Sequence, residues 1–105
     1  MKRAMPAGRW QVYMLRCADG TLYTGITNNL KRRLLAHGTG RASRYTRSRL
    51  PVLLVYSEFV RGRRAALRRE MAIKSLSRTD KLALLGAGSR PGYMHVVGSG
   101  RLRHW

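Results

Sequence analysis

The distribution of apolar and polar positions along the chain predicts three strands. Residues 10–17 are rich in strand-forming side chains, and a second segment of this kind covers residues 21–27. The turn sequence Ala-Asp-Gly at residues 18–20 separates them, which predicts a hairpin. A third apolar run, residues 52–56, has the length of a strand, and we place it at the centre of the sheet.

Helical spacing and end signals predict three helices after the hairpin. The first covers residues 30–37 and stops at Gly38, the second covers residues 63–76, and the third is short and ends at Gly86. Residues 39–50 are polar and basic, and we expect a loop or a short helical turn there. The candidate N-caps are Asn28 or Asn29 for the first helix, and Ser77 or Thr79 for the third.

These elements follow the order β-β-α-β-α-α. They indicate an α+β fold in which a small three-stranded antiparallel sheet is flanked by helices. A chain of 105 residues supports one domain, which we place at residues 10–86. We expect residues 1–9 to form a disordered basic tail. Residues 87–105 form a C-terminal appendage that either orders on nucleic acid or covers the sheet.

The length of the hairpin turn decides whether Tyr13 and Tyr23 share a face of the sheet. Sequence propensity alone favours a two-residue Asp-Gly turn, which would point the two side chains to opposite faces. A three-residue loop with Gly20 in the left-handed conformation pairs Tyr13 with Gly25 and puts both tyrosines on one face. We expect this second register, with Gly25 leaving open space over the sheet for a sugar-phosphate chain. The alternative is that both tyrosines are ordinary strand residues.

Two polar residues lie on the apolar stripe of the first helix. Arg33 and His37 follow the helical spacing of Leu30 and Leu34, which must face the sheet. A guanidinium group near that seam costs desolvation energy unless an anion such as phosphate meets it. Alternatively, the stem of Arg33 packs on Leu34 while its head reaches water, and His37 is a helix C-terminal residue favoured by the dipole.

Glu70 lies on the apolar stripe of the second helix, beside Ala66 and Ile73. We assign it as the one acid placed to hold a divalent ion, because Mg²⁺ is commonly bound through one or two carboxylates with phosphate and water oxygens. The alternative is an ion pair with Lys74 or with Arg33. The other three acids are assigned to a turn, to a position beyond a strand and to the first turn of a helix: Asp19, Glu58 and Asp80.

The charge of the chain points to a polyanionic partner. There are 22 Lys and Arg against 4 Asp and Glu, a formal net charge of +18. Nucleic acid is the first candidate and an anionic membrane surface the second, although GC-rich coding and ribosome association also produce basic proteins. The expected contact patch follows the first helix and consists of Arg41, Arg44, Tyr45, Arg47 and Arg49.

The cysteine content and the N-terminal segment restrict the remaining classes. Cys17 is the only cysteine, which excludes an internal disulfide and a cysteine-based zinc site. The N-terminal residues have no apolar core like that of a signal peptide, and nothing resembles a membrane span. We therefore expect a cytoplasmic protein.

The order and spacing of these residues resemble the GIY-YIG endonuclease superfamily, in particular its small single-domain bacterial branch. The resemblance covers about residues 10–85. It rests on the segments Val12-Tyr13-Met14 and Tyr23-Thr24-Gly25, on the pair Arg33 and His37, and on Glu70. Asn28 and Asn29 are the only asparagines, so the late asparagine of several relatives is missing.

The resemblance implies a role for each of these side chains. Tyr13 would help to activate the attacking water, alone or through His37, and Tyr23 would orient water or phosphate. Arg33 would stabilise the pentacovalent phosphate, and Glu70 would bind Mg²⁺ or Mn²⁺.

The sequence therefore predicts a metal-dependent endonuclease that acts on DNA, in single-stranded or branched form, with weak sequence specificity. The alternative is a non-catalytic, basic nucleic-acid-binding protein on the same scaffold. No membrane or obligate protein partner is evident, and the oligomeric state is left open.

Overall fold

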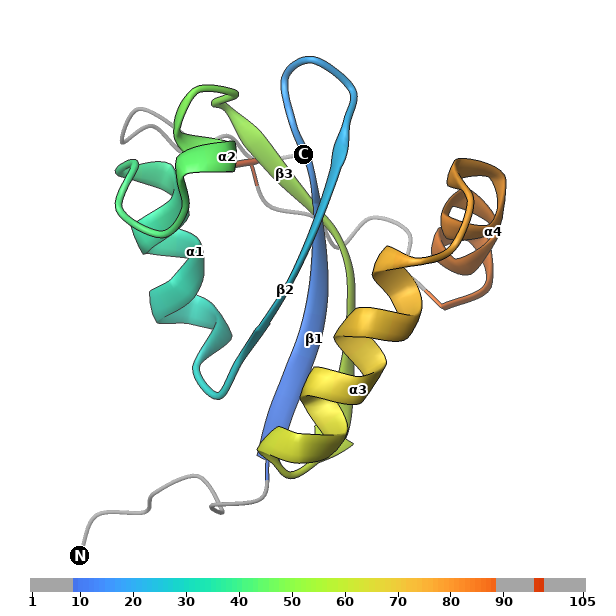
Figure 1. Cartoon of the computed structure of the whole chain (residues 1–105). Helices are drawn as coiled ribbons and strands as arrows, with labels where there is room; N and C mark the ends of the chain where they lie inside the picture. Colours follow the sequence, from blue (N-terminus) through green and yellow to red (C-terminus); the bar gives the residue numbers. More distant parts are fainter. Residues whose placement is uncertain (1–8, 89–95, 98–105) are drawn as a thin grey trace, which may run out of the picture.

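Three long antiparallel strands form the centre of the computed structural model, which describes residues 9–88 and 96–97 (Figure 1). The strands are β1 (Arg9–Arg16), β2 (Leu22–Thr27) and β3 (Val52–Arg61), and the two-residue β4 (Val96–Val97) pairs with the start of β3. Their order in the sheet is β2-β1-β3-β4, with every pair antiparallel. The predicted α+β class is confirmed.

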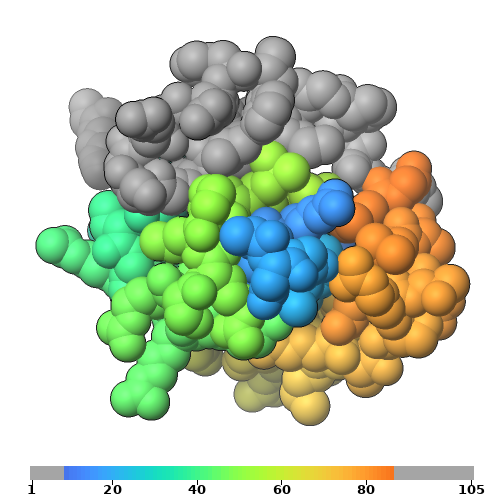
Figure 2. Space-filling model, turned by 90° about the horizontal axis from the view of Figure 1, so that it is seen from above, coloured from blue at the N-terminus to red at the C-terminus, as the bar shows by residue number. Residues whose placement is uncertain are grey.

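Helices cover both faces of this sheet. Helices α1 (Leu30–Gly38) and α2 (Arg44–Arg47) lie on one side, and α3 (Arg63–Lys74) and α4 (Arg78–Gly88) lie on the other (Figure 1). Seen from above, the blue β1–β2 hairpin lies between the green α2 region and the yellow to orange α3–α4 region (Figure 2). No helix among the described residues is long and apolar enough to cross a membrane.

The predicted element order is confirmed, and the caps explain the helix boundaries. The side chain of Asn29 accepts a hydrogen bond from the backbone N–H of Arg32, which starts α1. Ser77 accepts one from the backbone N–H of Asp80 in the first turn of α4. The expected short helical turn within residues 39–50 is α2, which Ser43 caps.

The predicted inner position of residues 52–56 is confirmed, because β3 lies between β1 and β4, and β1 is an inner strand as well. Two details of the predicted sheet differ. The third strand continues to Arg61, since its second half alternates exposed and partly buried positions and so falls outside an apolar run. The sheet also gains β4. Apart from residue 9, residues 87–88 and β4, the predicted tail and appendage lie outside the described residues.

The hairpin turn is the three-residue loop that places the two tyrosines on one face. The backbone N–H of Cys17 donates to the carbonyl of Thr21 over 2.8 Å, and Gly20 has a φ of 85°. The register pairs Tyr13 with Gly25, and Leu15 with Tyr23. Left-handed backbone at Gly20 is favourable because glycine has no Cβ. The expected register is therefore confirmed.

Alternate residues of β1 supply two separate cores. Tyr13 and Leu15, with Cys17 directly after the strand, pack with Leu34 of α1 and with Leu54, and Tyr23 lies against this cluster. The opposite face carries a second cluster that includes residues of α3: Val12, Met14, Tyr56, Ala66 and Ile73. The face that holds both tyrosines is therefore the α1 face.

Glu58 lies inside β3 rather than beyond the strand, which corrects its predicted position. Arg69 of α3 donates two hydrogen bonds to its carboxylate, of 2.7 and 3.1 Å, and the hydroxyl of Tyr56 donates another. Burial alone would raise the pKa of Glu58, but these hydrogen bonds outweigh it and lower the pKa. These hydrogen bonds join α3 to the sheet, and they engage both carboxylate oxygens of Glu58.

Thr24 offers a test of the packing against α3. It is 3 % exposed and pairs with Met14, and its hydroxyl is the one buried side-chain polar atom without a hydrogen-bond partner among the described residues. Thr24→Val should raise the free energy of unfolding in urea by about 1 kcal/mol, because it removes an unpaired polar group. The control Thr27→Val should lower it, since the Thr27 hydroxyl accepts a 3.0 Å hydrogen bond from Asn29 N–H. A less stable Thr24→Val protein would contradict this interpretation.

Candidate active site

A buried chain of hydrogen bonds runs from β1 through α1 to α2. The hydroxyl of Tyr13 lies 2.8 Å from Nε2 of His37, and Nδ1 of His37 lies 2.8 Å from Oγ1 of Thr46. Tyr13 is 1 % exposed, and His37 and Thr46 are fully buried. His37 is therefore not a surface residue at a helix end. It is the middle member of a polar chain inside the α1 face of the sheet.

Tyr23 completes an aromatic cluster with the first two members of this chain. Its ring centroid lies 6.4 Å from that of Tyr13 and 5.2 Å from that of His37. The ring stacks on Tyr45, with centroids 5.9 Å apart. Tyr13 and Tyr23, the two tyrosines predicted to share a face, therefore pack together with the imidazole of His37 between α1 and the sheet.

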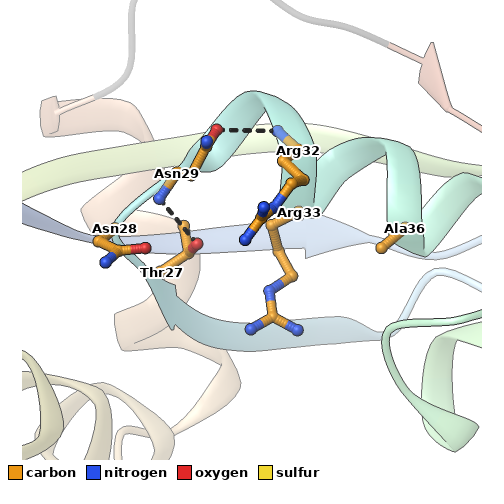
Figure 3. Close-up of a pocket in the computed structure, with 6 residues that line it drawn as sticks. All are labelled: Thr27, Asn28, Asn29, Arg32, Arg33 and Ala36. Carbon is orange, nitrogen blue, oxygen red and sulfur yellow. Dashed lines mark hydrogen bonds between the residues drawn. The ribbon is translucent and has the colours of Figure 1, made fainter. Parts of the chain in front are cut away.

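A cavity opens at the start of α1. Its volume is about 230 Å³, and two arginines, Arg32 and Arg33, lie on the same side of α1 along its wall (Figure 3). The first turn of α1 holds no acidic residue. Cations at the positive end of a helix dipole are unfavourable unless an anion joins them. The lining residues are Thr27, Asn28, Asn29, Arg32, Arg33 and Ala36.

The charges of Arg33 and Glu70 both act on Tyr13, although these residues come from helices on opposite sides of the sheet. Burial is the main cause that raises the pKa of Tyr13 well above its usual value. The neighbouring Tyr23 and Glu70 raise it further, and Arg33 lowers it. Tyr13 is therefore a neutral phenol at neutral pH and a poor base by itself. Any proton that it takes from water needs an onward acceptor, and His37 is the group within hydrogen-bond reach.

Glu70 keeps the position that the sequence indicated, on the helix face that carries the buried Ala66 and Ile73. Its side chain is 16 % exposed, and Lys74 lies 3.2 Å from one carboxylate oxygen. The lysine is the exposed partner, and an i,i+4 pair on a helix contributes only about 0.3 kcal/mol, so Lys74 is easily displaced. The described residues contain no group of three metal-ligating side chains. Glu70 suits a Mg²⁺ ion that keeps water and phosphate oxygens as its other ligands.

Gly25 does not provide the expected open space over the sheet. A Cβ atom at this position would lie 2.6 Å from the hydroxyl oxygen of Tyr13 and 2.7 Å from its Cζ. The tyrosine ring itself fills the space opposite this glycine. Gly25 therefore admits the Tyr13 ring, which corrects its predicted role as a seat for the sugar-phosphate chain.

This contact makes Gly25→Ala a sensitive test of the site. The methyl group must displace the Tyr13 hydroxyl from His37, and we expect a loss of stability of about 1 to 3 kcal/mol. Gly86→Ala is the matched control, because nothing lies within 4 Å of a Cβ there and alanine favours the helix. Urea unfolding of both variants measures the difference. Equal effects of the two substitutions would contradict the close packing of Tyr13 over Gly25.

The predicted basic patch after α1 divides into two parts. The guanidinium of Arg49 lies 3.8 Å from the centre of the Tyr45 ring, and its Nε donates to Asp19 over 2.9 Å. Because Tyr23 also stacks on this ring, Tyr45 is not a free platform for a base, which corrects its expected stacking role. Through these two contacts, Arg49 links Tyr45 of α2 to Asp19 of the hairpin turn. The remaining members are exposed: Arg41, Arg44 and Arg47.

The sequence pattern did not indicate the role of Thr46 or the ion pair between Arg49 and Asp19. The signal for Thr46 was available only indirectly. Ser43 is a good N-cap, and its side chain accepts from the backbone N–H groups of Tyr45 and Thr46. The single helical turn that follows directs Thr46 inward, whereas Arg44 and Arg47 are exposed. Nothing in the local sequence indicated that this turn would reach His37.

The buried imidazole makes stability depend on pH. Burial, and then the charge of Arg33, lower the pKa of His37 from 6.5 to about 4. The unfolded chain takes up this proton at higher pH than the folded protein, so stability falls as the pH decreases from 6.5 to about 4. The loss is on the order of 3 kcal/mol.

Urea unfolding at several pH values between 7 and 4.5 measures this loss for the wild-type protein and for His37→Gln. The glutamine variant should lack this part of the pH dependence. Glu58 is present in both proteins, so its contribution cancels in the comparison. Parallel stability curves for the two proteins would show that His37 does not have a lowered pKa.

Comparison with known proteins places this geometry in a family. The family described as "GIY-YIG catalytic domain" matches residues 9–83. A UPF0213 protein of Desulfotalea psychrophila is 54% identical over 82 residues, which are 77% of this chain and 74% of that protein. A UPF0213 protein of Clostridium perfringens is 51% identical over 78 residues, which are 74% of this chain and 84% of that protein.

A solved structure agrees with the fold. The solution NMR structure of a UPF0213 protein from Bacillus halodurans is 37% identical to this chain and has a TM-score of 0.53. The match covers 79% of this chain and 88% of that chain. With the family match over residues 9–83, these relatives show that the chain belongs to the GIY-YIG nuclease superfamily and, within it, to the UPF0213 proteins.

Proposed function

We propose that this protein is a divalent-metal-dependent endonuclease that hydrolyses phosphodiester bonds in DNA. The observation that carries the proposal is the 2.8 Å hydrogen bond between Tyr13 and His37. The charges of both Arg33 and Glu70 act on the phenol of Tyr13. This arrangement combines a proton path, a cation for phosphate and a carboxylate for a metal ion. The net charge of +18 supplies the attraction to a polyanionic substrate.

In this proposal Arg33 binds the phosphate group that is cleaved. It lines the cavity at the start of α1, where the backbone dipole also favours an anion. A guanidinium group offers paired donors to two phosphate oxygens and stabilises the charge that develops on them in the transition state. Arg32, on the same cavity wall, strengthens the local positive field.

Tyr13 and His37 move the proton. The phenolic oxygen accepts a proton from the attacking water while its own proton passes to Nε2 of His37. The water oxygen forms the new bond to phosphorus, and the bond from phosphorus to the leaving oxygen breaks. The imidazole is neutral in the resting protein, since the pKa of His37 is about 4, so one ring nitrogen keeps a lone pair that can receive the proton.

Glu70 is the residue that would hold Mg²⁺ or Mn²⁺, and the ion would supply positive charge for the phosphate and for the leaving oxygen. The lysine beside Glu70 is exposed and does not block the carboxylate, because an i,i+4 pair on a helix is weak and easily displaced. Tyr23 packs against His37 and helps to orient water or phosphate in the same space.

The exposed arginines Arg41, Arg44 and Arg47 extend the proposed contact to the sugar-phosphate backbone. They would contact phosphate groups rather than base edges, and phosphate contacts carry no sequence information, so we propose weak sequence specificity. Single-stranded or branched DNA is the proposed substrate form. The net charge of +18 also fits a basic protein that binds nucleic acid without cleaving it.

A cleavage assay separates the two functions. Purified protein is incubated with labelled single-stranded, duplex and forked DNA, with Mg²⁺ or Mn²⁺ and with a chelator as control. We expect metal-dependent cleavage that Arg33→Gln lowers by about 10²-fold or more. Lys31→Gln removes the same charge from an exposed site on the same helix and should cleave almost normally. Binding without cleavage of any substrate would favour the non-catalytic protein, and equal losses in both variants would contradict the role of Arg33.

A further inference from the structure

Both ring nitrogens of His37 are occupied, so the position of its single proton decides what the imidazole can do. At neutral pH the ring is neutral, and one nitrogen donates a hydrogen bond while the other accepts one. Nε2 faces the Tyr13 hydroxyl and Nδ1 faces the Thr46 hydroxyl, each over 2.8 Å. Only the form with its proton on Nδ1 leaves Nε2 free to accept a proton from Tyr13.

The surroundings of Thr46 favour that form. Its Oγ1 lies 3.4 Å from the backbone carbonyl of Ser43, which can only accept a hydrogen bond. When the hydroxyl proton is directed to this carbonyl, Oγ1 is left to accept from Nδ1–H of His37. Hydrogen bonding of a threonine to the carbonyl three residues earlier is a common arrangement in helices.

The position of Thr46 is fixed by the short helix that carries it. Ser43 caps α2, and the backbone N–H of Arg49 donates to the carbonyl of Thr46 over 2.9 Å. The side chain is fully buried, so water does not compete for the imidazole. A β-branched side chain also has few rotamers, which limits where the hydroxyl can point.

We propose that Thr46 is a positioning residue that holds His37 in the Nδ1–H form and so directs the Nε2 lone pair at the Tyr13 hydroxyl. This inference deepens the proposed nuclease function and rests on it for its catalytic consequence. The form of the imidazole itself is a property of the folded protein, and it can be measured without any substrate.

Nitrogen-15 NMR of the histidine rings tests the proposal at pH 7 in the full chain. The chain has three histidines, and the signals that disappear in His37→Gln identify those of His37. We expect a protonated, pyrrole-type Nδ1 and an unprotonated, pyridine-type Nε2. In Thr46→Val, which replaces the hydroxyl with a methyl group of similar size, the proton should move partly or wholly to Nε2. Thr46→Ser, which keeps the hydroxyl, should retain the wild-type spectrum.

Cleavage rates supply the second measurement. Thr46→Val should lower kcat by about 10- to 100-fold with little change in KM, because a wrongly placed proton blocks transfer but not binding. Thr46→Ser should restore most of the rate. Thr39→Val is the matched control, since Thr39 is exposed and its hydroxyl also bonds to helix carbonyls, at Leu35 and Ala36. It should cleave at the wild-type rate.

A wild-type His37 that carries its proton on Nε2, or that is doubly protonated at pH 7, would overturn the proposal. So would a Thr46→Val protein that keeps the wild-type spectrum and rate. If Thr46→Val does not fold, the wild-type and Thr46→Ser spectra still decide the result. Absence of cleavage by the wild-type protein would count against the nuclease function and leave the spectrum to decide the role of Thr46.

Discussion

Replacement of Tyr13 by phenylalanine is expected to lower the rate of DNA cleavage by about 10²- to 10⁴-fold, the range associated with loss of a positioned acid–base group. The variant removes one oxygen atom and keeps the ring that fills the space over Gly25. Loss of the hydroxyl breaks the hydrogen bond between β1 and the imidazole of His37. Single-turnover rates at saturating protein measure the effect on chemistry apart from binding.

Tyr56→Phe is the control for this prediction. Tyr56 is also buried, but it belongs to the core cluster on the opposite face and donates its hydrogen bond to Glu58. Its replacement should lower stability without a comparable loss of cleavage in the folded protein. A Tyr13→Phe protein that cleaves within about threefold of the wild-type rate would exclude Tyr13 from the proton path.

Glu70→Gln is expected to abolish metal-dependent cleavage, with a loss of about 10³-fold or more at low metal concentration. The amide keeps the size of the side chain but cannot supply the negative charge that a divalent cation needs. The rate measured against Mg²⁺ concentration distinguishes weak metal binding from slow chemistry. Weak binding would be partly rescued at high concentration.

Lys74→Gln is the matched control for Glu70. It breaks the 3.2 Å ion pair from the other side and leaves the carboxylate in place. The metal dependence should stay the same or shift to slightly lower concentration, because a neighbouring positive charge is removed. A Glu70→Gln protein with an unchanged Mg²⁺ dependence would exclude this carboxylate as the metal ligand.

Local patterns predicted the elements of the fold because their causes are local. Asn29 and Ser77 cap their helices through hydrogen bonds to backbone N–H groups only three residues away, so the caps do not depend on the rest of the fold. An apolar run that follows a proline forms a strand in many proteins. The extent of β3 was not predictable in the same way. Residues 57–61 of that strand alternate in burial, and Glu58 looks like a loop residue until Arg69 of α3 is placed beside it.

The spacing of the sequence indicated candidate site residues but not their connections. A polar residue at the spacing of a buried helical stripe is conspicuous, which made Arg33, His37 and Glu70 candidates. The hydrogen-bond partner of His37 on α2, and the use of Gly25 to admit a ring, depend on how elements pack in three dimensions. Tyr45 and Arg49 were assigned to DNA because their types suit it, whereas the fold engages both within the protein.

We propose that Tyr13 and Glu70, from β1 and α3, act as one catalytic unit. A double-mutant cycle in single-turnover cleavage tests it most directly, with the wild-type protein, Tyr13→Phe, Glu70→Gln and the double variant. We predict that the double variant is only a few-fold slower than the slower single variant, because residues of one unit lose their contribution together. If the fold-loss of rate in the double variant equals the product of the two single losses, the two residues act independently, and this result would contradict the proposal.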